Sequence, residues 1–276
     1  MKQGYWIVRT YEAGIVGEKT KYWVKGDRPS GKSRRRERAE IRKQEQNEYS
    51  AIKRMARLIN ANFSEGDLLI GLDYSPAGME KLIAWATEQN AAFSETPEEE
   101  RDDMLIEAAW HEAVLCLRRV AREMKKDGLE LKYIPITSDM DGETGEKVRV
   151  HHHLVVNREA GPYFARKWEK LGTVNWKTMS KQADYTPIAE YFIKQVRHIP
   201  DADKFRSSRN LIRPQPKDRV VTSDAELRVP KGGKLLFRQE QKRYGGVSYQ
   251  PQYIRYIIPP EKRKICQQQA GGGAEI

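Results

Sequence analysis

The residues with the clearest chemical potential are three consecutive histidines inside an apolar stretch, Val148-Arg149-Val150-His151-His152-His153-Leu154-Val155-Val156. This pattern predicts a β-strand, in which neighbouring side chains point to opposite faces. His152 then shares the core face with aliphatic residues, whereas His151 and His153 share the other, less apolar face. Two imidazoles at i and i+2 on one face can chelate a single divalent cation. The alternative is a sheet surface that carries three histidines without a ligand.

A second candidate is the pair Tyr191 and Lys194, which lie three residues apart in a helix predicted over residues 186–197. This spacing places both side chains on one helix face, oblique to the apolar stripe. A phenol beside an ammonium group can act as a nucleophile, because the cation favours the phenolate. The alternative is an ordinary amphipathic helix with a half-buried tyrosine.

The elements that must position these residues follow the order β-α-β-β-α-β-α between residues 67 and 197. We expect strands at 67–74, 130–139, 147–157 and 172–177, and helices at 77–90, 98–126, 161–171 and 186–197. Pro135 favours an edge position or a bulge for its strand, since proline cannot donate to a sheet ladder. This order predicts an α+β fold, a ferredoxin-like (split βαβ) antiparallel sheet with helices on one face.

Flanking segments have a different composition. Residues 5–10 and 20–25 read as a β-hairpin, and a polar helix follows at 34–62. Beyond residue 198 the chain is rich in proline and basic residues, with short β-like pieces at 219–222, 235–238 and 252–258. The polar tail from residue 267 is expected to be disordered.

Taken together, the motifs resemble those of the HUH endonucleases. These enzymes carry a histidine motif on a central strand and a Y-x-x-K motif on a later helix, matched here by His151-His152-His153 and, after 37 intervening residues, by Tyr191 to Lys194. Residues 67–75 (DLLIGLDYS) stand where the family has its first motif, and 189–194 (AEYFIK) and 206–214 (RSSRNLIRP) look like the Rep proteins of rolling-circle plasmids and phages. One position departs from the pattern, because His152 stands where a bulky hydrophobe is usual. The alternation still favours His151 and His153 as the metal pair.

The resemblance implies a site-specific endonuclease that nicks and joins single-stranded DNA at a replication origin. It divides the chain into an N-terminal hairpin and basic helix (1–57), the HUH nickase domain (58–214) and a basic C-terminal extension (215–276). Tyr191 is implied as the nucleophile that forms a 5′-phosphotyrosyl intermediate, and Lys194 as the group that assists it.

The resemblance also implies a cofactor, a divalent metal ion (Mg²⁺ or Mn²⁺), held by His151 and His153. Such sites usually have a third, acidic ligand. Asp139, at the end of the neighbouring strand, is our candidate, while Asp141 and Glu143 lie nearer the hairpin tip. The alternative for Asp139 is a solvated carboxylate in a turn.

Charge favours a polyanionic partner. The 276 residues include 50 Lys and Arg against 39 Asp and Glu, a net charge of +11, and basic surfaces bind phosphate backbones through counterion release. The basic side chains expected to contact DNA include Arg34, Arg35, Arg36, Arg206 and Arg209. The alternative for each basic stretch is a solvated charged face.

Several classes are excluded or disfavoured. The sequence has no apolar run long enough for a membrane helix and no signal-peptide pattern, and its two cysteines cannot build a disulfide framework, so we expect a cytoplasmic protein. It has no G-x-x-x-x-G-K-[ST] motif, so a host helicase and polymerase are the expected partners.

Two alternative functions stay open. One is an HUH relaxase or transposase of a mobile element, which shares the same chemistry. The other is a non-catalytic ferredoxin-like module, which would carry base-stacking aromatic residues on its central strands. Residues 147–157 contain none.

Overall fold

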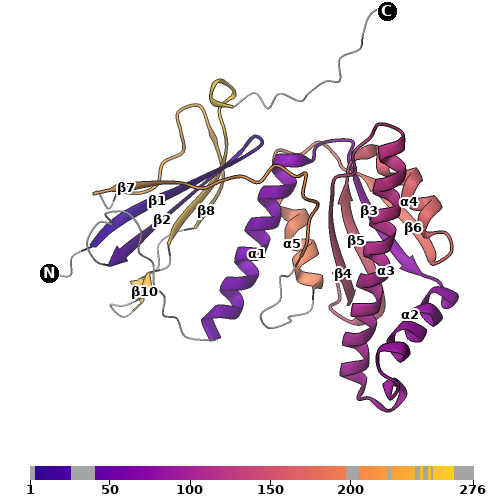
Figure 1. Ribbon diagram of the computed structural model, residues 1–276. Helices are drawn as coiled ribbons and strands as arrows, with labels where there is room; N and C mark the ends of the chain where they lie inside the picture. The colour runs from indigo at the N-terminus through magenta and orange to yellow at the C-terminus, as the bar shows by residue number, and fades with distance from the viewer. Residues whose placement is uncertain are drawn as a thin grey trace, which may run out of the picture. The chain divides into compact units, whose positions relative to one another are not determined.

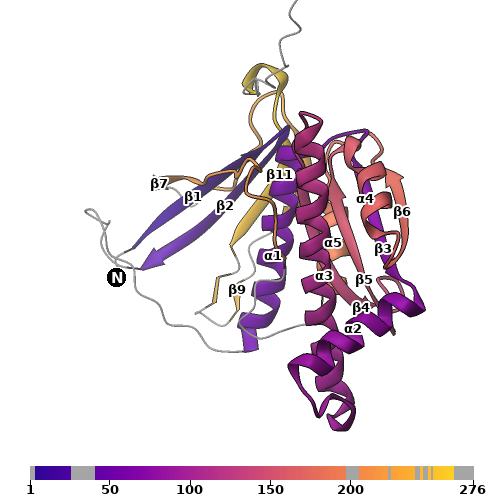
Figure 2. The same ribbon diagram turned by 45° about the vertical axis from the view of Figure 1, so that its right-hand side comes forward.

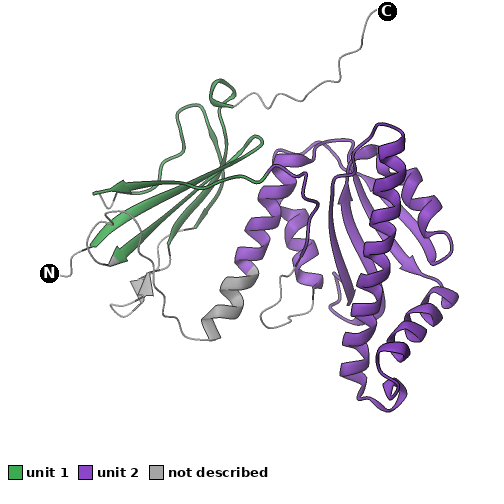
Figure 3. Ribbon diagram, viewed as in Figure 1, with its two compact units in different colours: residues 1–39, 213–276 green, residues 40–212 purple. Residues whose placement is uncertain are grey.

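The computed structural model describes residues 4–25, 41–196, 205–222, 225–239, 243–244, 248–249 and 251–263. The chain forms two compact units (Figure 3): unit 1 comprises residues 1–39 and 213–276, and unit 2 comprises residues 40–212. Both units contain an antiparallel sheet, and all five α-helices of the described residues belong to unit 2. The fold class is therefore α+β, as predicted.

Unit 2 is built on a four-stranded antiparallel sheet (Figure 1). Its strands run in the order β4-β5-β3-β6, with bounds Tyr133–Met140 (β4), Lys147–Val156 (β5), Leu68–Tyr74 (β3) and Gly172–Thr178 (β6). The register pairs Gly71 of β3 with His153 of β5 on one side and with Asn175 of β6 on the other. β4 lies at an edge, which is where Pro135 was expected to place it.

The helices of unit 2 cover both faces of this sheet (Figure 2). One face packs against α2 (Pro76–Gln89), α3 (Glu98–Lys126) and α4 (Gly161–Trp168), and the other against α1 (Ile41–Asn62) and α5 (Thr186–Gln195). The prediction of helices on one face was therefore wrong. The reason is that α1 and α5 are both amphipathic, and their apolar stripes bury Val155 and Ile136 on the second face.

Local signals explain where the key helices begin. Ser75 caps α2 by accepting a hydrogen bond from the Gly78 N–H, and Pro76 occupies the first helical turn, where its missing N–H costs nothing. Pro187 likewise occupies the first turn of α5. α5 therefore starts at a defined residue, which fixes the position of Tyr191 one turn later along the chain.

Unit 1 joins the two ends of the chain in one sheet. Its strands run in the order β7-β1-β2-β11-β8, and the bounds are Gly4–Ala13 (β1), Val16–Lys25 (β2), Lys217–Val221 (β7), Lys234–Gln239 (β8) and Gln252–Ile257 (β11). Unit 1 also contains a separate two-stranded sheet, formed by Arg243–Tyr244 (β9) and Ser248–Tyr249 (β10). Its small core includes Val8, Ile254 and Tyr256.

The strand pairing groups the chain differently from the predicted segments 1–57, 58–214 and 215–276. The N-terminal hairpin pairs with the C-terminal strands, so the C-terminal extension is not irregular over β7, β8 and β11. Helix α1 belongs to unit 2, because its apolar residues pack beneath α5. None of the helices in the described residues is long and apolar enough to cross a membrane.

Candidate active site

The three histidines of β5 alternate as predicted. His152 is 1 % exposed and faces the core formed with α3 and α4, whereas His151 and His153 lie on the face covered by α5. His152 Nδ1 lies 2.9 Å from the Thr137 hydroxyl of β4, and its Nε2 lies 2.9 Å from the Tyr74 hydroxyl of β3. The middle histidine is therefore a structural bridge across three strands rather than a ligand.

One assignment of hydrogens satisfies this bridge completely. The Tyr74 hydroxyl donates to the Ala109 carbonyl at 3.2 Å, and its oxygen accepts from His152 Nε2. His152 Nδ1 then accepts from the Thr137 hydroxyl, which requires a neutral ring. Burial lowers the pKa of His152 to about 3, and repulsion from the two neighbouring histidines contributes less. The ring is therefore neutral at neutral pH.

His151 and His153 present their ring nitrogens to each other. Their Nε2 atoms lie 3.0 Å apart, and the rings meet edge to face with centroids 4.8 Å apart. His151 Nδ1 donates to the Arg149 carbonyl at 3.0 Å, because that oxygen can only accept, and this leaves a lone pair on Nε2 of the neutral ring. His151 Nε2 then accepts the hydrogen bond from His153 Nε2, and the two nitrogens would converge on one cation if binding displaced that proton.

This donor pair fits a divalent cation. Two nitrogens each about 2.1 Å from one ion at roughly a right angle are about 3 Å apart, which matches the observed separation. Burial, with repulsion from His151, lowers the pKa of His153 to about 4, so its ring is neutral and able to ligate. Two histidines alone leave coordination positions for oxygen ligands, which Mg²⁺ and Mn²⁺ prefer.

Asp139 does not join the histidine pair. It is 4 % exposed and lies at an irregularity of β4, where the register with β5 shifts between Ser138 and Met140. Within the described residues, no group of three or more His, Cys, Asp or Glu side chains is arranged to hold a metal ion. The structure thus brings the two histidines together without the acidic ligand that the sequence suggested.

Asp73 is the acidic residue that the sequence reasoning missed. It pairs directly with His151 in the β3–β5 register and lies on the same face of the sheet, because Leu72 and Tyr74 on either side of it point into the opposite core. Its carboxylate accepts a hydrogen bond from Asn175 of β6 at 3.1 Å, and its charge offsets a small part of the lowering of the His153 pKa that burial causes. The alternation of β3 indicated its face, but only the register shows that it lies beside His151.

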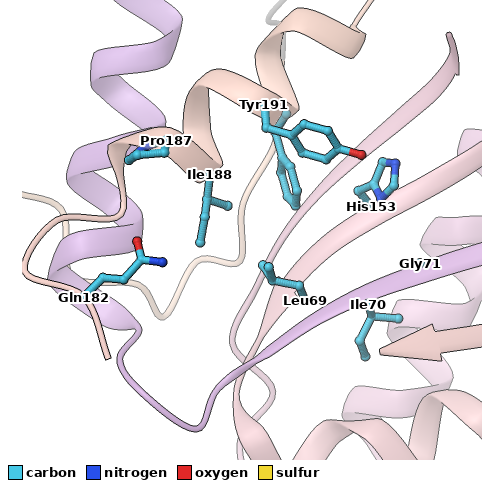
Figure 4. A pocket seen from close by; sticks show the side chains of 9 residues that line it. Leu69, Ile70, Gly71, His153, Gln182, Pro187, Ile188 and Tyr191 are labelled. Atoms are coloured by element: carbon cyan, nitrogen blue, oxygen red, sulfur yellow. The ribbon is translucent and has the colours of Figure 1, made fainter. Parts of the chain in front are cut away.

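Tyr191 lies against His153. The two rings meet edge to face with centroids 5.8 Å apart, and the Tyr191 hydroxyl points toward the imidazole (Figure 4). Its neighbour Phe192 is buried and anchors α5 to the sheet, whereas Tyr191 is 42 % exposed. A Cβ at Gly142 of the β4–β5 turn would lie 2.7 Å from the Tyr191 ring, so glycine lets the turn pack closely on the phenol.

Gln195 connects the tyrosine helix to the histidine pair. It is 1 % exposed, its backbone carbonyl accepts from the Ser138 hydroxyl at 2.6 Å, and its amide donates to the Tyr191 carbonyl at 3.2 Å. Its Oε1 is buried without a well-formed hydrogen bond, yet the side chain is near enough to the His153 ring to offset part of the lowering of that ring's pKa by burial. The Gln195 side chain thus lies beside the His153 ring.

The remaining predicted residues fall into three groups. Lys194 is exposed on α5, and no hydrogen bond joins it to Tyr191 within the part of the chain that the structure describes. Arg206 and Arg209 are exposed beside the start of β4, since Ser208 bonds to Tyr133, whereas His151 pairs at the far end of that strand. The guanidinium of Arg206 stacks 4.9 Å from the Trp110 ring. Arg34, Arg35 and Arg36 lie outside the described residues.

Comparison with known proteins adds no assignment. No protein-family model, curated protein or solved structure matches the chain significantly.

Proposed function

We propose that the chain is a single-stranded DNA nicking and joining endonuclease of the HUH type, acting as an initiator of rolling-circle replication. The observation that carries the proposal is the contact between Tyr191 and His153, with ring centroids 5.8 Å apart. This contact puts an accessible phenol next to two histidines whose Nε2 atoms converge. A nucleophile and a cation site thus share one face of one sheet.

The topology of unit 2 supports the proposal. β3 and β4 run parallel to each other, because each is antiparallel to the intervening β5. This order, with α2 and α3 in the crossover and β6 on the other side of β3, is compatible with a split βαβ, ferredoxin-like sheet. The HUH resemblance implies the same arrangement, with its histidines on the central strand.

His151 and His153 are the residues that would hold Mg²⁺ or Mn²⁺, with Asp73 adjacent. When bound, the cation supplies Lewis-acid polarisation of the scissile phosphate. Gln195 and the Arg149 carbonyl each hold one histidine ring in orientation, as the outer partners of ligating histidines do. The protein's part is thus a pair of imidazole rings held in a fixed direction.

Tyr191 performs the covalent step in this proposal. Its Oη attacks phosphorus, the bond from phosphorus to the 3′ oxygen breaks, the phenol proton passes to water and the 3′ oxygen takes a proton from water. The products are a 5′-phosphotyrosyl enzyme and a free 3′-OH. A 3′-OH attacking the same phosphorus reverses the step and releases Tyr191. Lys194, one turn along α5, adds positive charge for the incoming phosphate.

Other parts of the proposal concern partners. The net charge of +11 suits a DNA backbone, with Arg206 and Arg209 as exposed contacts in unit 2. Strand separation and synthesis would come from a host helicase and polymerase.

A covalent-trapping experiment tests the function. The full chain is incubated with a pool of randomised single-stranded DNA and Mn²⁺, and the product is run on a denaturing gel. We expect a shifted protein–DNA band for the wild type and for the control Tyr163→Phe, whose hydroxyl bonds to Asp127 on α3's C-terminal end. We expect none for Tyr191→Phe. Binding without any covalent band would instead support the non-catalytic module.

A further inference from the structure

Beside the Tyr191 hydroxyl, unit 2 contains an open pocket of about 290 Å³. Its floor is the sheet at Leu69 and Gly71, and its wall is the start of α5 at Pro187 and Ile188 (Figure 4). Its volume lies at the low end of small-molecule pockets, about 300–1,000 Å³, so it suits one flat ring system rather than several nucleotides. Proposed catalysis at Tyr191 does not use this space.

We propose that this pocket binds one nucleobase, that of a nucleotide adjacent to the cleaved phosphate, and that Gln182 reads its edge. The proposal rests on the proposed function, because it places the scissile phosphate at the Tyr191 hydroxyl. A base attached to that phosphate reaches the pocket directly, since the Tyr191 ring is part of its lining.

The floor of the pocket carries a glycine, Gly71, that its packing does not require. Packing requires glycine at Gly78 and Gly172 of this unit, where a Cβ would come 2.0 and 1.8 Å from a backbone carbonyl oxygen, and the backbone at Gly128 and Gly145 has a positive φ. At Gly71 the nearest atom to an added Cβ is the Asn175 carbonyl oxygen, at an ordinary 3.9 Å. Glycine weakens the interior of a strand, and where packing does not demand it, close approach by a ligand is a physical reason for it. Here the bare backbone leaves the pocket floor flat beside His153.

The walls of the pocket combine apolar side chains with one amide. Leu69, Ile188 and Phe192 offer apolar surface to the faces of a planar ring, and the Tyr191 ring borders it. Such surfaces stack on any base and give no selectivity by themselves. Gln182 is the one amide in the lining. It donates one N–H to the Ser180 hydroxyl at 3.2 Å, which restrains the amide while its oxygen and second N–H remain able to meet a base edge.

Binding of mononucleotides tests the pocket without requiring cleavage. The probes are the four deoxynucleoside 5′-monophosphates, titrated into the full chain while the methyl resonances of Ile188 and Leu69 are followed by NMR. We expect at least one probe to shift these resonances saturably. Gly71→Val, whose side chain would occupy the floor, should weaken that binding at least tenfold, and Gly71→Ala should weaken it less. No shift with any of the four probes would overturn the proposal.

The sequences of covalently trapped DNA test the reading by Gln182. The wild type should enrich one base at a position next to the linked phosphate. Gln182→Ala and Gly71→Val should flatten that preference at that position alone, whereas Gln89→Ala, an exposed glutamine at the end of α2, should leave it unchanged. Unchanged flanking preferences in both pocket variants would overturn the proposal while leaving nicking intact. Absence of any trapped DNA, with mononucleotides still bound, would overturn the proposed function and leave the pocket.

Discussion

Three identical side chains on β5 have two different environments. His152 is buried and bridges Thr137 and Tyr74, whereas His151 and His153 turn their Nε2 atoms toward each other beside Tyr191. The difference follows from the two-residue period of the strand, since one face packs on α3 and α4 and the other meets α5. The role of each histidine therefore depends on the face of the strand that it occupies and not on its residue type alone.

The largest expected effect is on the half-buried pair, His151 and His153. Replacing His151 and His153 together by alanine should abolish Mn²⁺ binding and DNA nicking, because both ring ligands are removed. The free energy of unfolding should fall by less than for His152→Ala, because His151 and His153 are half-buried whereas His152 is fully buried. Titration calorimetry with Mn²⁺ and the covalent-trapping gel measure the first two effects. His111→Ala, an exposed histidine on α3, is the control and should bind Mn²⁺ normally.

Replacing His152 should instead lower the stability of the fold. His152→Ala should destabilise the fold by about 2–4 kcal/mol, since it leaves a cavity and unpaired hydroxyls. The wild type should also lose stability as pH falls from about 6.5, the unfolded pKa, toward 3, the folded pKa. The unfolded chain binds the proton over this range and the folded ring does not.

The pH dependence is measured against a variant that does not titrate. Relative to His152→Phe, wild-type stability should fall by up to about 1.4 kcal/mol per pH unit below pH 6.5. Denaturant melts between pH 7 and about 4 give this difference and cancel the contribution of His153. A difference that is constant with pH would show that His152 is not buried in its neutral form.

A smaller effect is expected behind the histidine pair. Gln195→Leu removes the oxygen that faces His153 and should weaken Mn²⁺ binding by about 10- to 100-fold, as loss of an outer partner of a ligating histidine does. Gln195→Glu keeps an acceptor oxygen and should restore the affinity. If both variants bind Mn²⁺ like the wild type, Gln195 contributes packing alone.

The smallest effect concerns exposed arginines remote from the pair. Arg206→Gln with Arg209→Gln should flatten the salt dependence of single-stranded DNA binding by about 0.7 in log–log slope for each phosphate that is no longer neutralised. Arg166→Gln is the control, because Arg166 is already paired with Glu123 at 2.9 Å. An unchanged slope would assign Arg206 to its stack on Trp110 alone.

Periodicity made most of unit 2 predictable. The strand at 147–157 and the helices at 77–90 and 98–126 appear within a few residues of the expected bounds, because their apolar patterns are long and clear. The two-faced covering by helices was missed, since the order of elements does not say which face a helix packs on. The sheet of unit 1 was missed for a related reason: its partners lie more than 200 residues apart in sequence.

The sequence also predicted part of the candidate site. Alternation placed His151, His152 and His153 on the faces that the structure shows, and helical spacing placed Tyr191 away from the apolar stripe of α5, where its ring meets His153. Asp73 and Gln195 could not be identified, because their relation to the histidines depends on strand register and on how deeply α5 packs. Asp139 forms no three-residue metal-binding group with the histidines in the described residues, and the register of β4 shifts beside it, between Ser138 and Met140.

The central claim is that Tyr191 is the nucleophile that faces the histidine pair. Trapped adduct is digested with trypsin and nuclease, and the modified peptide is fragmented by mass spectrometry. Fragmentation is essential because the expected peptide, residues 182–194, contains both Tyr185 and Tyr191. The account predicts the phosphonucleotide on Tyr191, since Tyr185 is buried and donates its hydroxyl to the Ser180 carbonyl at 3.1 Å. A phosphonucleotide on Tyr185, or on any other tyrosine of the chain, would contradict it.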